Sequence, residues 1–227
     1  LKILAQTDLA ATFDNIKDTT EGAIAILSQF RSEVRAAGGE VQFLEKAMDS
    51  INSVSKSFAV ESSDLISVVR RTGGVFEAAG GKLNELIALF TSVRATTRET
   101  ADTIATGFRT IFTRIQRSET IDSLKELGIV LQDTEGKFVG PMEAIARLSA
   151  GLKALDPRDF RFNEIVEQLG GFRQIGKVIP LIKQYQTSTE ALAVANNSLG
   201  STARDAGIAQ QGLGIQFLML KEKFDAT

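Results

Sequence analysis

Apolar residues along this chain recur mostly at the spacing of an amphipathic helix. Between residues 41 and 58 they are separated by three, four, three and seven positions, which places them on one helical face. These residues are Val41, Leu44, Met48, Ile51 and Phe58. Shorter stripes over residues 9–16 and 24–34 predict two earlier helices, and Gly38-Gly39 ends the second of them.

The clearest predicted helix spans residues 96–115. Thr96 and Glu99 have the spacing of a capping box, so the sequence predicts that the helix begins there. An apolar stripe follows at Ile104, Phe108, Ile111 and Ile115. The arginines of this region fall largely off that stripe; they are Arg98, Arg109, Arg114 and Arg117.

Residues 130–140, with the sequence VLQDTEGKFVG, interrupt the helical pattern. Two short apolar runs flank residues 133–136, where a glycine suits a turn that needs positive φ. The segment is therefore predicted to form a small β-hairpin near residues 129–139. Because a two-stranded hairpin is marginally stable alone, we expect it to seal the core through Val130 and Phe138 or to pair with a neighbouring chain.

Helical patterns resume at Pro141, which suits the first turn of a helix, and a break follows at Gly170-Gly171. The expected fold class is therefore all-α, a mainly helical, bundle-like domain with one small hairpin.

Composition fits a globular chain and removes several classes of chemistry. Of the 227 residues, 43% are hydrophobic and 24% charged, and a net charge of −2 gives no bulk attraction to nucleic acid or to an anionic membrane. The chain has no Cys and no His, so it lacks thiolate nucleophiles, disulfides and the commonest general acid–base group. It also lacks an apolar run of 18 residues, the length needed to span a bilayer.

Two carboxylate pairs lie about one helical turn apart, Glu99 with Asp102 and Glu164 with Glu167. A glycosidase needs two carboxylates that face each other across a cleft, usually beside aromatic rings that hold the sugar. The chain has no Trp and one Tyr, so solvated helix faces are the favoured interpretation of these pairs.

Metal and phosphate motifs are equally weak. Residues 133–136 lack the alternating acidic positions of a calcium loop, so an Asx-type turn is favoured.

The arginines of residues 94–117 could follow a phosphate backbone. Acidic residues are interspersed among them and no aromatic residues interleave, so a solvated face or pairing between subunits is favoured. The sequence therefore predicts no catalytic, cofactor-binding or metal-binding residue, no specific nucleic-acid site and no enzyme activity.

Three stretches follow one another in a characteristic order. Residues 58–115 start a helix at a serine–acid pair and end in a helix with a loose small–x–x–[ST]–x–[LF]–[RK] pattern. Residues 124–148, LKELGIVLQDTEGKFVGPMEAIARL, contain a Leu–x–x–Leu–Gly helix end, an acid-rich turn and a helix that starts at proline. Residues 162–182, FNEIVEQLGGFRQIGKVIPLI, contain a helix that breaks and resumes. This order resembles the globular core region of the tape measure proteins of long-tailed bacteriophages, although the usual [IL]–Phe–Gly is replaced by residues 168–172, QLGGF.

The resemblance implies a division of the chain and a function. We expect a helical lead-in segment over residues 1–60, a tape-measure core domain over 61–186 and a helical exit segment over 187–227. The exit segment would lead toward a longer coiled region, so the chain is expected to be a fragment of a larger protein. Such a protein is a structural ruler: it sets tail length during assembly, occupies the lumen of the tail tube and leaves at DNA ejection.

The same resemblance implies the partners and the location. The partners would be further copies of the chain (a trimer or hexamer around the tail axis), the tail tube protein, tail-tip or baseplate hub proteins and tail assembly chaperones, with contact to the host envelope at ejection. The protein would reside in the virion tail, in the lumen or at the tip, and in the host cytoplasm during assembly. The alternative is a peptidoglycan-degrading or membrane-active helical module of a virion protein.

Overall fold

The computed structural model describes residues 20–153 and 158–206, and every regular element in them is a helix. The labelled elements are α2 (Arg31–Ala36), α3 (Glu40–Phe58), α4 (Ser62–Ala78), α5 (Leu83–Thr97), α6 (Ala101–Arg114), α7 (Ser118–Glu126), α8 (Pro141–Lys153), α9 (Phe160–Gly170), η1 (Phe172–Gln174), α10 (Ile175–Lys183) and α11 (Tyr185–Asn196). Residues 20–29 and 201–206 are also helical. The predicted all-α fold class is confirmed.

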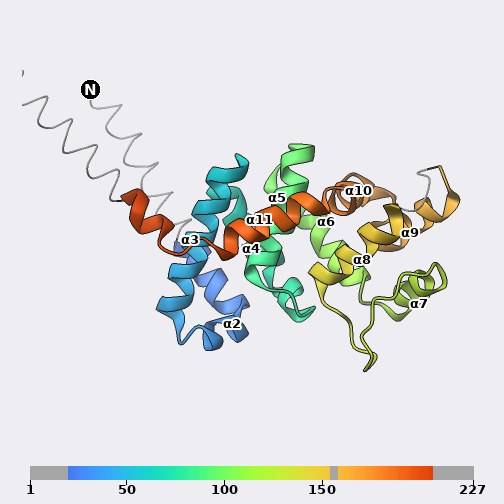
Figure 1. Cartoon of the computed structure of the whole chain (residues 1–227), viewed down its shortest axis with the longest axis horizontal. Coiled ribbons are helices and arrows are strands. Elements are labelled where there is room, and N and C mark those ends of the chain that lie inside the picture. Colours follow the sequence, from blue (N-terminus) through green and yellow to red (C-terminus); the bar gives the residue numbers. More distant parts are fainter. Residues whose placement is uncertain (1–19, 154–157, 207–227) are drawn as a thin grey trace, which may run out of the picture.

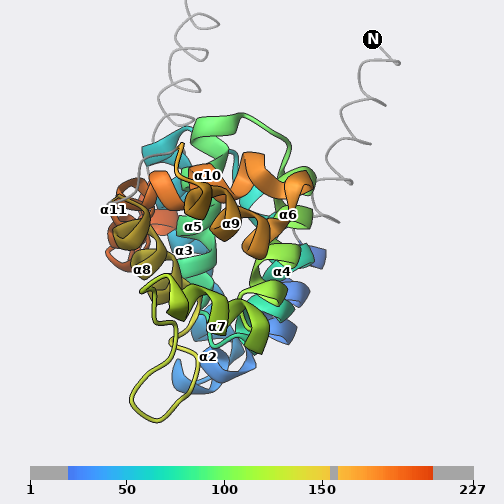
Figure 2. The ribbon, with the colours of Figure 1, turned by 90° about the vertical axis from the view of Figure 1, so that its right-hand side faces the viewer.

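The helices form an elongated body (Figure 1). Helices α2 and α3 lie at one end, α7 and α9 lie at the other, and α11 runs along one side over α5. Figure 2 shows the body from the end that carries α9. One hydrophobic core extends through it, from Ile26 to Ala195.

Helix α5 is the centre of this body. Every residue from 86 to 93 is buried, so more than two full turns are covered on all sides. The surrounding elements include α3, α4, α6, α10 and α11. Thr91 and Ser92 are polar residues in the buried turns. The hydroxyl of each donates a hydrogen bond of 2.8 Å to a carbonyl of the same helix, so neither is left without an acceptor.

An aromatic cluster joins α4 to α6. The rings of Phe76 and Phe112 meet edge to face at 4.8 Å, and those of Phe108 and Phe112 at 5.3 Å. All three side chains are fully buried, and this geometry suits the quadrupoles of the rings. The apolar stripe predicted from Ile104 to Ile115 is therefore confirmed as a core face.

The predicted helix over residues 96–115 is wrong at its start. Helix α5 continues to Thr97, Arg98 turns the chain with φ of 58°, and α6 begins only at Ala101. Thr100 is the residue that caps α6, because its hydroxyl accepts a hydrogen bond from the Thr103 amide. The hydroxyl of Thr96 instead donates to a carbonyl in the last turns of α5, so Thr96 and Glu99 do not form a capping box.

Helix α3 is confirmed, but the face predicted to be buried is partly wrong. Val41 is 66% exposed, whereas Phe43, Ala47 and Val54 are buried. Both sets have helical spacing, and packing against the rest of the chain selects the second. Ile51 is the one residue of the predicted stripe that is buried.

The predicted hairpin near residues 129–139 is also wrong. The segment is a loop closed by one isolated antiparallel bridge, between Gln132 and Phe138. On either side of this bridge the Asp133 amide donates to the Lys137 carbonyl and the Val139 amide to the Leu131 carbonyl. The guanidinium of Arg147 donates to the outward-facing carbonyls of Val130 and Gln132, which fixes the loop to α8. Leu131 is fully buried and Phe138 packs against the core, but Val130 is 45% exposed and does not seal it.

Replacing Phe76 with alanine tests the aromatic cluster. Because the side chain is fully buried, we expect Phe76→Ala to lower the free energy of unfolding by about 3–5 kcal/mol. Phe160→Ala is the matched control: this ring is 74% exposed, and its loss is expected to cost about 0.5 kcal/mol or less. Urea unfolding followed by circular dichroism measures both, and equal losses would contradict the cluster's role.

Candidate functional site

The two carboxylate pairs noted in the sequence lie in different surroundings. Asp102 accepts hydrogen bonds from Ser67 and Arg71 of α4, and Glu164 and Glu167 lie on the exposed face of α9. These three residues are exposed on helices, as the sequence favours. Glu99 differs, because it lies between α5 and α6, is partly buried and forms an ion pair of 2.9 Å with Lys177.

The carboxylates of the acidic turn at residues 133–136 bind groups of the same turn. One carboxylate oxygen of Asp133 accepts the backbone amides of Glu135 and Lys137, and the Glu135 carboxylate pairs with the Lys137 ammonium at 2.7 Å. This is the Asx-type turn that the sequence favours. In residues 20–153 and 158–206, no group of three or more side chains could hold a metal ion. No described helix is long and apolar enough to cross a membrane.

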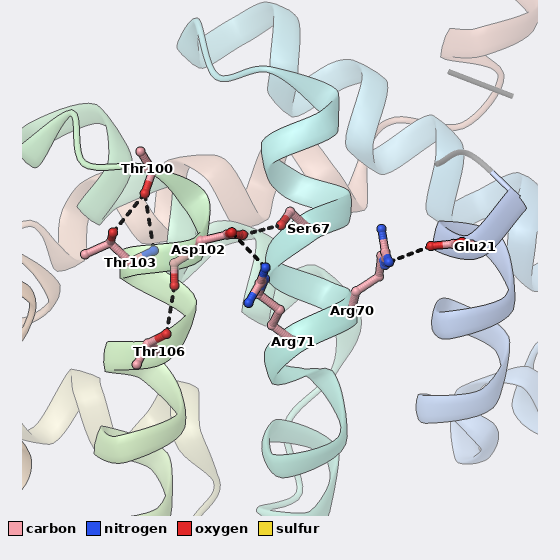
Figure 3. A network of polar contacts seen from close by, with 8 residues as sticks. All are labelled: Glu21, Ser67, Arg70, Arg71, Thr100, Asp102, Thr103 and Thr106. Atoms are coloured by element: carbon pink, nitrogen blue, oxygen red, sulfur yellow. Dashed lines mark hydrogen bonds and ion pairs between the residues drawn. The ribbon is translucent and has the colours of Figure 1, made fainter. Parts of the chain in front are cut away.

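A polar network ties three helices together beside the core (Figure 3). Asp102 of α6 receives Arg71 at 2.7 Å and Ser67 at 3.0 Å, both from α4. Arg70, one position before Arg71, donates to Glu21 of the helix over residues 20–29 at 2.6 Å. Helix α4 therefore holds both the lead-in helix and α6, and the network's role is to fix these elements.

A second set of polar contacts holds residues 198–206 against α3. We call the α3 residues that make them the exit clasp: Asp49, Ser50, Asn52 and Lys56. The carboxylate of Asp49 accepts the backbone amides of Gly200 at 2.7 Å and Thr202 at 2.9 Å, and thus caps a helix that begins 150 positions later in the chain. Asp49 is only 7% exposed, so these bonds are shielded from water.

The other clasp residues extend the contact along α3. Ser50 donates to the carbonyl of Ala195 at 3.1 Å. Asn52 hydrogen bonds to Asp205, and Lys56 forms an ion pair with the same carboxylate. The clasp therefore contacts the exit segment from Ala195 to Asp205 and fixes its direction as well as its first residue.

The electrostatics of the clasp depend on charged carboxylates. Burial raises the pKa of Asp49, but the hydrogen bonds from Thr202, Gly200 and Ser201 together outweigh that effect and leave the pKa below its ordinary value. The pKa of Asp205 is lowered by the hydrogen bonds from Asn52 and Lys56. Both acids thus favour the charged form in the folded chain.

An apolar hollow of about 800 Å³ lies beside the clasp. Its lining includes Val41, Leu44 and Met48 of the predicted α3 stripe, together with Leu199 and Ala203 of the exit segment. The exit segment therefore meets α3 through polar bonds and leaves apolar side chains beside them.

The arginines of residues 94–117 lie in different surroundings, and Arg98 is the residue that turns the chain between α5 and α6. Arg94 pairs with Asp64 of α4 at 2.9 Å and is partly buried. Arg109, Arg114 and Arg117 instead line one pocket of about 360 Å³, which we call the arginine pocket. Its other lining residues are Val75, Thr106, Thr110 and Thr113, so no acidic side chain from the described part of the chain lines it.

The exit clasp is hardly indicated by the amino-acid sequence. Its one local signal is the pair Asp49-Ser50, two polar residues that are buried in the middle of an amphipathic helix. Their partners lie about 150 positions away, and no spacing rule links the two segments. The contacts of the exit clasp are suited to holding the exit segment in place.

Comparison with known families assigns the chain to one of them. Residues 3–171 match the family of phage-related minor tail proteins, which covers more than half of the 227 residues. The chain belongs to this family and is a structural protein of a phage tail, where it associates with other tail components. No solved structure matches the chain.

Replacing Asp49 with alanine tests the clasp. The change leaves two backbone amides without their acceptor, so we expect a loss of about 2 kcal/mol in the free energy of unfolding. Amide hydrogen exchange at Gly200 and Thr202 should accelerate more than exchange in α5. Glu45→Ala, one turn earlier on the exposed side of α3, is the control and should change neither quantity. Unchanged protection at Gly200 and Thr202 in Asp49→Ala would contradict the capping role.

The clasp should also weaken in acid. Since the pKa of Asp49 is lowered on folding, its contribution is complete above the ordinary carboxyl pKa of 3.8 and is lost as the pH falls through the lowered value. The difference in unfolding free energy between the wild type and Asp49→Asn should therefore shrink below about pH 4. Urea unfolding at several pH values measures it, and a difference that grows on acidification would contradict this sign.

Proposed function

We propose that this chain is the globular part of a tail tape measure protein, the structural ruler that sets tail length. In this role it assembles with the tail tube protein, hub proteins and tail assembly chaperones, occupies the tail lumen or tip, and leaves at DNA ejection. Family membership supports a structural role in the tail, and the order of motifs over residues 60–185 supports the tape measure assignment within it.

The observation that carries the proposal is the exit clasp. A ruler needs a globular body from which a helical polypeptide departs in a fixed direction, because a freely hinged junction would add a variable length. Asp49, Asn52 and Lys56 hold the exit segment along α3 from Gly200 to Asp205. The clasp supports a defined start for any helical chain that follows it.

The lead-in helix starts from the same end of the body. Figure 1 shows residues 20–29 and 201–206 close to α3, at the end opposite α9. The Glu21–Arg70 pair and the exit clasp fix these two helices to neighbouring elements, α4 and α3. Both flanks of the body are thus anchored at one end, which suits a globular part carried on an extended protein.

The proposal assigns the chain no catalytic step. The carboxylates that could have served a hydrolase are engaged in ion pairs or lie exposed on a helix, and the chain has no His and no Cys. Clearing of a suspension of purified peptidoglycan by the chain would overturn this part of the proposal.

Tail length in the phage tests the ruler. An α-helix rises about 1.5 Å per residue, so inserting about 40 helix-forming residues in frame after Ala206 should lengthen the tail by about 60 Å. Electron micrographs of negatively stained particles measure the length.

An insertion of half that size is the matched control, because a ruler responds in proportion and should then give half the increase. Assembled tails of unchanged length with both insertions would show that the chain does not set tail length.

A further inference from the structure

The arginine pocket carries positive charge that no acidic side chain of the described residues neutralises. The side chains of Arg109 and Arg117 are exposed and make no ion pair or hydrogen bond within the described residues. Arg114 donates to the backbone carbonyl of Glu167 at 3.2 Å, which fixes its direction without cancelling its charge. The nearest acid on α6, Asp102, is already paired with Arg71.

Helix α7 carries a complementary set of unpaired acids. Glu119, Asp122 and Glu126 follow one another at helical spacings of three and four, and all three are exposed. We call them the acidic face of α7. The opposite side of the helix, with Ile121 and Leu124, is buried in the body. None of the three acids forms an ion pair in the part of the chain that the structure describes.

The two sets match in charge and in number. Three guanidiniums lie between Arg109 and Arg117, and three carboxylates lie between Glu119 and Glu126. At about 1.5 Å per residue, the acidic face along α7 extends over roughly 10 Å, whereas two of the arginines belong to α6 and Arg117 lies just before α7. They follow each other directly in the chain, yet they remain unpaired because the buried side of α7 turns its acidic face away from the body.

A nucleic acid fits the pocket less well than a protein carboxylate does. Binding to a phosphate backbone usually rests on a longer row of basic residues, and single strands also need aromatic rings for stacking. The pocket offers three arginines with threonines between them, on a chain whose net charge is −2. Planar guanidiniums also suit paired hydrogen bonds to carboxylates.

We propose that the arginine pocket of one copy receives the acidic face of α7 from a second copy. The proposal rests on the tail-assembly role argued above and names the surface through which the chain self-associates. Because the contact joins two unlike surfaces, it can close a ring of copies; made twice about a two-fold axis, it gives a dimer.

Charge reversal of each surface tests the contact in the 227-residue chain. Arg109→Glu with Arg117→Glu reverses the pocket, and Asp122→Arg with Glu126→Arg reverses the acidic face. All four residues are exposed, so circular dichroism should show an unchanged helical content. Light scattering coupled to size exclusion should find an oligomer for the wild type and a monomer for each variant alone.

Mixing the two variants is the decisive step. In the mixture each reversed surface meets an oppositely charged one, so the oligomer should return. It should dissociate when the salt concentration rises from about 0.1 M to about 1 M, since the screening length then falls from about 10 Å to about 3 Å. Arg31→Glu with Arg35→Glu on α2 is the matched control and should leave the wild-type mass unchanged.

Three results would overturn the proposal: a monomeric wild type at about 0.1 M salt, variants that still associate alone, or a mixture that stays monomeric. If instead the wild type retains a duplex DNA fragment and the pocket variant does not, the pocket is a phosphate site. None of these outcomes alters the tail-length result, so failure of this contact and failure of the ruler can be told apart.

Discussion

Burial of α5 on every side is the constraint on which the rest of the structure depends. A helix with no face left for water must be surrounded, and here the surrounding helices come from distant parts of the sequence. Helices α3 and α4 precede it, while α10 and α11 return to it about 90 residues later. This return brings residues 195–205 next to α3 and makes the exit clasp geometrically available.

Periodicity predicts which segments are helical but not which face is buried. In α3, the set that begins at Val41 and the set that begins at Phe43 both have helical spacing, so only the neighbouring helices decide between them. The boundary at residues 97–101 was missed for a similar reason. Several threonines and an acid there could each cap a helix. The left-handed turn is made by Arg98, whereas a glycine at that position would have indicated it in the sequence.

The loop at residues 129–140 forms the predicted turn without the predicted strands. Its turn has the hydrogen bonds that the sequence indicates and one antiparallel bridge, and Arg147 of α8 binds the outward-facing carbonyls of Val130 and Gln132. The buried side chain also differs from the one expected, because Leu131 enters the core while Val130 faces water. The exit clasp was beyond sequence reasoning altogether, because one acid caps a helix about 150 positions away.

The two functional arrangements differ in the environment of their charges. In the clasp, the carboxylate of Asp49 is shielded and bonded to backbone amides, so its contacts are stable within one copy. The arginine pocket and the acidic face of α7 are exposed, and an exposed ion pair contributes only about 0.2–1 kcal/mol. Several such pairs must therefore act together in the contact that we propose, and for the same reason that contact should be sensitive to salt.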